Sequence, residues 1–150
     1  MANAKKEAVR QTTTQTGTLP GGGVCELWRV FNAELVNGAA TVESIVESSG
    51  LNRGFLLVEF SNFGLWIIAS SVTGTPDIKV EIQQSYDDTA ANYIEPATGS
   101  VVVASIADEV AHVYSVSPSP MPYCRIQLTG AGGNPADTIV TAYWWMQGAQ

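Results

Sequence analysis

Few residues in this chain of 150 have the chemistry of an active site. His112 is the only histidine, and it alternates with apolar neighbours in Val110–Tyr114, a pattern typical of a residue on the face of a β-strand. A lone imidazole cannot supply the histidine pair of a zinc site, and the chain contains neither G-x-S-x-G nor H-E-x-x-H. The sequence therefore excludes hydrolases built on those motifs.

Paired carboxylates are the remaining candidates for acid–base chemistry. Asp87-Asp88, Asp108-Glu109 and Glu95 would have to meet in a cleft to act as the two carboxylates of a glycoside hydrolase do. The pair at 87–88 directly follows a strand pattern, where acidic residues usually form a solvated turn. We expect that turn, with a hard-cation site as its alternative. We further expect that the protein is not an enzyme and has no cofactor or metal.

The glycines and cysteines have structural interpretations. Gly130–Asp137 lacks the Lys-Ser/Thr ending of a P-loop and precedes a β pattern, so we expect a loop between the last two strands and not a phosphate site. Cys25 and Cys124 are far apart in sequence, and neither has a Cys or His at ligand spacing. We expect two buried thiols, with a disulfide as the alternative.

The elements that position these residues are predicted to be β-strands. After Gly23, short apolar runs are separated by Gly, Pro, Asn, Asp and Ser, and helical signals are scarce. This spacing predicts an all-β fold, an antiparallel two-sheet β-sandwich with jelly-roll connectivity as the leading option. Ser61–Gly64 is expected to be a hairpin loop that pairs the flanking strands. The predicted strands are Val24–Val36, Thr41–Val46, Phe55–Phe60, Leu65–Ser70, Ile78–Gln83, Val101–Ile106, Val110–Val116, Tyr123–Thr129 and Thr138–Met146.

Composition divides the chain into two parts. Residues 1–23 are polar, rich in Thr and Gly, and carry a net charge of +2, whereas residues 24–150 carry −9, for a total of −7. We expect residues 1–23 to be an extended basic arm and residues 24–150 to be the sandwich domain. The acidic body repels phosphates, so we do not expect nucleic acid as a partner. No apolar run reaches the 18 or so residues of a membrane span, and residues 1–23 lack the apolar region of a signal peptide, which predicts synthesis in the cytoplasm.

The aromatic residues indicate an interface. Side chains alternate along a strand, so Trp144 and Trp145 must point to opposite faces, and the outer ring gains by being covered. The runs at 55–58 and 65–68 are also apolar on both faces, although a solvated sheet normally shows water one face. Only 14% of residues are charged, against about 25% in a typical domain. We therefore predict self-association through Trp145, Tyr143 and Trp66, assisted by three basic residues of the arm, Lys5, Lys6 and Arg10.

Three segments carry a resemblance to a known family. Val80–Asp87, Met121–Gly130 and Gly133–Thr138 resemble segments of the small β-sandwich proteins that decorate or cement the capsids of tailed bacteriophages. The resemblance covers roughly residues 77–147 and consists of strand and turn residues without a catalytic signature. It implies a virion protein on the capsid surface, with the major capsid protein as partner and a homo-oligomer, often a trimer, as the assembled form.

Two other functions remain open from the residues alone. A β-sandwich with exposed tryptophans, here Trp28, Trp66 or Trp145, is also typical of carbohydrate-binding modules. A phage tail or fibre component is a variant of the structural hypothesis, because composition does not separate it from a capsid component.

Overall fold

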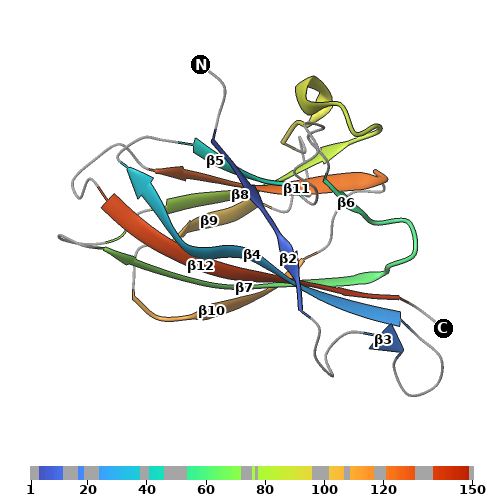
Figure 1. Ribbon diagram of the computed structural model, residues 1–150, viewed down its shortest axis with the longest axis horizontal. Coiled ribbons are helices and arrows are strands. Elements are labelled where there is room, and N and C mark those ends of the chain that lie inside the picture. Colours follow the sequence, from blue (N-terminus) through green and yellow to red (C-terminus); the bar gives the residue numbers. More distant parts are fainter. Residues whose placement is uncertain are drawn as a thin grey trace.

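The computed structural model describes residues 4–11, 17–18, 24–37, 41–45, 54–71, 76, 78–95, 102–106, 109–116, 121–130 and 137–148. These residues form two β-sheets packed face to face, with a single 3₁₀ turn, η1 (Ala90–Asn92), as the only helical element among them (Figure 1). The all-β sandwich predicted from the sequence is confirmed. No helix in these ranges has the length and apolar composition needed to cross a bilayer.

Each sheet has six strands. Sheet A contains, in spatial order, β1 (Ala4–Glu7), β5 (Thr41–Ile45), β11 (Tyr123–Gly130), β8 (Ile78–Ser85) and β9 (Val102–Ile106), with β6 (Phe55–Leu56) also paired to β11. Sheet B contains β10 (His112–Val116), β7 (Asn62–Ser71), β12 (Asp137–Gln147), β4 (Val24–Asn37) and β2 (Val9–Arg10), with β3 (Gly17–Thr18) also paired to β4. All pairs are antiparallel except β1 with β5.

The connectivity is that of a jelly roll. When the eight longest strands are numbered along the chain, sheet A has the order second, seventh, fourth, fifth, and sheet B has the order sixth, third, eighth, first. Consecutive strands therefore alternate between the sheets, except the fourth and fifth, which pair within sheet A, and this is the double Greek-key pattern. The jelly-roll expectation is confirmed.

The core lies between the sheets and follows the period of two. In β8, Ile78, Val80 and Ile82 point inward and are fully buried. In β12 the buried Trp144 is stacked on Phe63, with ring centroids 5.8 Å apart. Burial of one large aromatic side chain contributes several kcal/mol to folding at about 25 cal/mol per Å². The predicted split of Trp144 from Trp145 is therefore confirmed: Trp144 enters the core, and Trp145 lies on the outer face of sheet B.

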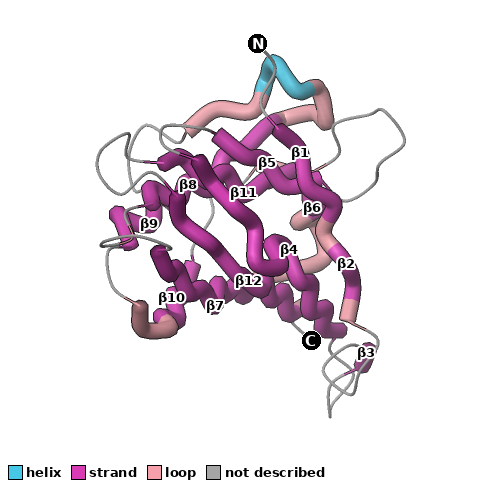
Figure 2. The backbone as a smooth tube through the Cα atoms, turned by 60° about the vertical axis from the view of Figure 1, so that its left-hand side comes forward, coloured by secondary structure: helices cyan, strands magenta, loops and turns pink. Residues whose placement is uncertain are grey.

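Part of the predicted N-terminal arm, residues 4–10, pairs with both sheets. Residues 4–10 form β1 on the edge of sheet A and β2 on the edge of sheet B, so the segment crosses one open side of the sandwich (Figure 2). Ala8, at the crossing, is 3% exposed. The polar composition of residues 1–23 concealed this pairing, because backbone groups alone make an edge strand and no apolar pattern is required.

The predicted hairpin around Ser61–Gly64 is wrong. Asn62 and Gly64 lie within β7, and the run before it does not pair with β7: β6 joins β11 in sheet A, and Leu57–Phe60 closes a turn. Phe55 and Leu57 are buried in the core from sheet A, whereas Leu65 and Ile67 are buried in it from sheet B. The loop at Gly130–Asp137 likewise connects different sheets, and residues 131–136 lie outside the described ranges.

Candidate functional site

The outer face of sheet B carries a row of side chains that crosses all five of its principal strands. The cross-strand register joins Val113 to Trp66, Trp66 to Tyr143, Tyr143 to Arg29, and Arg29 to Val9. We call these five residues the aromatic row. It brings together two of the three predicted interface aromatics, from strands 77 residues apart in sequence.

The aromatic row is largely apolar, with Arg29 as its one charged member, and it is in part uncovered. Val113 is 76% exposed, Trp66 36% and Val9 46%, while Tyr143 is half-buried. The rings of Trp66 and Tyr143 meet edge to face at 5.7 Å, an arrangement that holds both side chains in place. Burial of such a surface would release water from three apolar side chains at once.

Trp145 extends the same face. It is half-buried on β12, with Gly64 opposite it on β7 and Leu27 opposite it on β4. Its position one pleat along from Tyr143 places it on the same side of the sheet. Trp66, Tyr143 and Trp145 lie on one outer face of sheet B, and their predicted role as interface residues remains a prediction.

The N-terminal segment that carries the three basic residues lies against the sandwich and does not extend away from it. Lys6 forms an ion pair with Glu34 at 3.5 Å, and Arg10 forms one with Glu26. The guanidinium of Arg10 also lies 5.5 Å from the centre of the Trp28 ring, within cation–π range. Lys5 is exposed on β1. These ion pairs bind the segment to β4 of sheet B.

A cavity of about 390 Å³ opens at this end of the sandwich. Its lining includes the aromatic residues Trp28, Phe60 and Tyr123 and the charged residues Glu26, Glu59, Asp88 and Arg10. Trp28 packs edge to face on Phe55 at 5.5 Å and donates its indole N–H to Glu26 at 3.0 Å. Aromatic rings beside charged groups form the lining typical of a small-molecule site.

The acidic turn after β8 is structural, as predicted. Asp87 accepts hydrogen bonds from Thr89 and from the Asn92 side chain, and the Asn92 bond lowers the pKa of Asp87. Asp88 accepts hydrogen bonds from the Gly54 backbone at 2.8 Å and from the Tyr93 hydroxyl at 2.6 Å. Burial of Tyr93 is the main cause that raises its pKa, and the hydrogen bond to Asp88 raises the pKa further. Asp87 is thus held within its own loop, and Asp88 ties that loop to the segment before β6.

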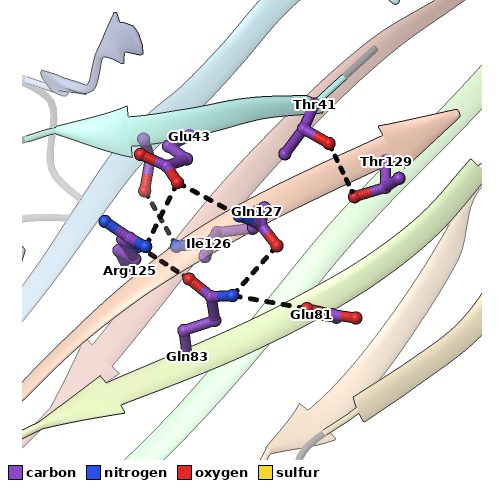
Figure 3. A network of polar contacts seen from close by, with 9 residues as sticks. Thr41, Glu43, Glu81, Gln83, Arg125, Ile126, Gln127 and Thr129 are labelled. Carbon is purple, nitrogen blue, oxygen red and sulfur yellow. Dashed lines mark hydrogen bonds and ion pairs between the residues drawn. The ribbon is translucent and has the colours of Figure 1, made fainter. Parts of the chain in front are cut away.

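The outer face of sheet A holds a polar network that the sequence did not reveal (Figure 3). Arg125 pairs with Glu43 at 3.1 Å and donates to Gln83 at 2.7 Å. Gln83 donates to Gln127 at 2.9 Å, and Gln127 donates to Glu43 at 3.1 Å, which closes a ring of four side chains on three strands. The four are between 5% and 9% exposed. Because they satisfy one another, we interpret the ring as structural.

This network corrects one detail of the sequence interpretation. The alternation in Ile78–Gln83 predicted a half-buried strand with a solvated polar face. Lys79 is indeed exposed, but Glu81 and Gln83 are buried on the outer side. Gln83 on β8 and Arg125 on β11 are direct register partners, which brings their polar side chains together on the outer face. That register is set by tertiary pairing and is absent from a single sequence.

The remaining candidates for chemistry are His112, the two cysteines and Asp108. His112 is half-buried on β10 and stacks on Tyr114 at 6.0 Å. Neither Cys25 nor Cys124 is part of a disulfide, both are buried as expected, and burial raises the pKa of the Cys124 thiol. Within the described ranges, no three Cys, His, Asp or Glu residues are grouped so as to hold a metal. Asp108 lies outside those ranges.

No protein-family model matches the chain, and no curated protein matches its sequence. Among solved structures, the N-terminal cellulose-binding domain of a β-1,4-glucanase from Cellulomonas fimi is similar over 99% of this chain and 98% of that one, at 15% identity and a TM-score of 0.41. A Cellvibrio japonicus carbohydrate esterase is similar over 85% of this chain and 35% of its own, at 12% identity and 0.36. The pili of Bacillus endospore appendages are similar over 100% and 96%, at 13% identity and 0.35. These similarities are too remote to assign a function or a site residue.

Proposed function

We propose that the protein is a non-enzymatic assembly protein that packs the outer face of sheet B against another copy of itself. The observation that supports this most is the aromatic row, in which Val113, Trp66 and Tyr143 lie side by side at the surface. The cross-strand neighbours of Trp66 are Val113 and Tyr143, so the only polar side-chain group that they could offer a sugar is the Tyr143 hydroxyl. An apolar surface on a second protein molecule would bury such a face.

Charge also favours this face as the meeting point of two copies. Residues 24–150 carry a net charge of −9, so identical domains repel one another over most of their surface. The aromatic row contains one charged residue, and that residue is Arg29. Copies that approach through this face avoid like charges at the contact.

We propose a phage capsid as the setting, on the basis of the resemblance of residues 77–147 to capsid decoration proteins. On a repeating shell each bound subunit raises the local concentration of the next, so that weak contacts add. The major capsid protein would be the second partner. The test is co-sedimentation of the purified protein with capsid shells. Retention of the wild-type chain supports the proposal, and equal retention of a variant with a charged aromatic row contradicts it.

Carbohydrate binding is the second candidate, and the cavity at the Trp28 end favours it. Trp28 and Tyr123 offer ring surfaces, while Glu26, Glu59 and Asp88 offer acceptors for hydroxyl groups. Titration of the tryptophan fluorescence with soluble oligosaccharides separates the two functions. A saturable change that is lost in Trp28→Ala and kept in Trp66→Ala supports the cavity as a sugar site, whereas an assembly protein shows no change.

A further inference from the structure

We propose that β10 is a docking edge, where the same strand of a second copy pairs with it antiparallel, so that sheet B continues from one molecule into the next. This inference rests on the proposed function for the identity of the partner, which is a second copy of the chain. It adds a contact between backbone groups at the edge of the sheet, separate from the contact of the aromatic row on its face.

The first argument is the position of β10. It is the end strand of sheet B and pairs with β7, and its other edge meets no strand in the described ranges. Figure 2 shows β10 and β9, the end strand of sheet A, on the side of the sandwich opposite β1 and β2. The N-terminal segment therefore closes one side of the sandwich, and β9 and β10 border the other.

The second argument is that β10 lacks the features that protect edge strands from pairing with other chains. Such strands usually carry charged residues, proline or a bulge. Residues 110–116 contain no Asp, Glu, Lys, Arg, Gly or Pro, and the register of β10 with β7 runs without a shift. Val110 is 61% exposed and Val113 76%. The strands β1 and β2, by contrast, carry Lys5, Lys6 and Arg10.

The third argument identifies the partner strand as a second copy of β10. Two antiparallel strands related by a two-fold axis present the same segment to each other, so one uncharged strand can serve as both partners. Residues 24–150 carry a net charge of −9, and an uncharged edge lets two copies meet without placing like charges in contact. Val102–Ile106 of β9, on the same side of the sandwich, also contains no charged residue.

The edge contact and the aromatic row would together build assemblies larger than a dimer. One contact extends sheet B in its own plane, and the other stacks the outer faces of two sheets. Each contact joins a surface to an identical surface, so a molecule can use one with its first neighbour and the other with its second. Growth through two such contacts is what an assembly protein requires.

Amide hydrogen exchange in the full-length chain tests the edge without any substitution. Along a strand, successive backbone N–H groups point alternately toward one neighbour and toward the other. The amides of β10 that face β7 should therefore exchange slowly in dilute and in associated samples. Edge pairing predicts that the alternate amides of residues 112–116 slow by about tenfold or more on association. Packing through the face of sheet B forms no hydrogen bonds along this edge, so unchanged exchange at those amides in the associated sample would overturn the proposal.

Proline substitution gives a second readout, because proline has no N–H to donate. His112 and Ser115 lie three positions apart on β10, so one N–H faces β7 and the other faces outward. Of His112→Pro and Ser115→Pro, the outward one should keep the wild-type free energy of unfolding. It should also raise the dissociation constant about 30-fold over the alanine variant at the same position, since a two-fold contact loses two hydrogen bonds, each worth roughly fivefold. A folded outward-proline variant that associates like its alanine control refutes the edge; if both proline variants unfold, the exchange result decides.

Trp145→Ala separates the edge from the proposed face, because Trp145 lies on β12, two strands from β10. If this variant associates more weakly and the alternate amides of β10 stay unprotected, the edge contact is refuted and the face stands. If the alternate amides are protected and Trp145→Ala associates as the wild type does, the face is refuted and the edge stands. A chain that stays monomeric at every concentration refutes both.

Discussion

Substitution of Val113 by lysine is the sharpest perturbation of the aromatic row. Val113 lies on the edge strand β10, is 76% exposed, and has Trp66 as its partner on β7. Because little of it is buried within its own chain, its replacement changes the surface and spares the core. Val58→Lys is the matched control, since Val58 is 70% exposed in the turn that follows β6.

The magnitude follows from the exposed fraction. Complete burial of a valine side chain is worth about 1.5 kcal/mol, so the three quarters still exposed contribute about 1 kcal/mol to association. An ammonium group buried at the contact without a partner costs a further 1 to 3 kcal/mol or so. The total of about 2 to 4 kcal/mol weakens association by about 30- to 1000-fold. The free energy of unfolding of the isolated chain changes by less than about 1 kcal/mol, as is usual for a surface position.

Sedimentation velocity over a range of concentrations measures the association, and urea unfolding measures the stability. We expect Val113→Lys to raise the dissociation constant of self-association by about 30- to 1000-fold. We expect Val58→Lys to match the wild type in both assays. The reasoning fails if Val113→Lys associates as the wild type does. It also fails if both variants weaken association equally, because a general charge effect would then explain the result.

Three further predictions address other parts of the molecule. Arg125→Met leaves the Glu43 carboxylate buried without its guanidinium partner. This should lower the free energy of unfolding, measured in urea, by about 3 to 5 kcal/mol. A loss below about 1 kcal/mol would show that water reaches the polar network. Gly54→Ala places a methyl group against the carbonyl oxygen of Cys124 and should destabilise by about 1 to 3 kcal/mol, and an unchanged melting temperature would contradict that close approach. Trp145→Ala should weaken association more than folding; the assignment of Trp145 to the outer face is wrong if this variant unfolds while its oligomeric mass is retained.

The period of two accounts for what the sequence predicted well. Ile78, Val80 and Ile82 alternate with polar residues, and Trp144 and Trp145 are adjacent in sequence. Once a strand is assumed, the pleat therefore fixes the face of the sheet on which each of these side chains lies. Local pattern alone therefore predicted the sandwich, its core and the outer aromatics. The eight long strands also followed from apolar runs separated by turn residues.

Features that depend on strand pairing were not predictable from local pattern. The runs at Phe55–Phe60 and Leu65–Ser70 read as a hairpin, but Phe55 has its cross-strand partner on β11, about 70 residues away. The edge pairing of residues 4–10 leaves no apolar signal, since backbone groups make it. The ring around Arg125 depends on the register of three strands, and a single chain carries no record of which polar residues meet.

The most direct test of the central claim is the mass of the full-length protein in solution, measured by sedimentation equilibrium from dilute to concentrated samples. If sheet B completes its burial on another copy, the mass rises with concentration to a multiple of 15.9 kDa, and Val113→Lys abolishes the rise. A constant mass of 15.9 kDa at every concentration, with Trp66 and Trp145 still accessible to a fluorescence quencher, would contradict the claim.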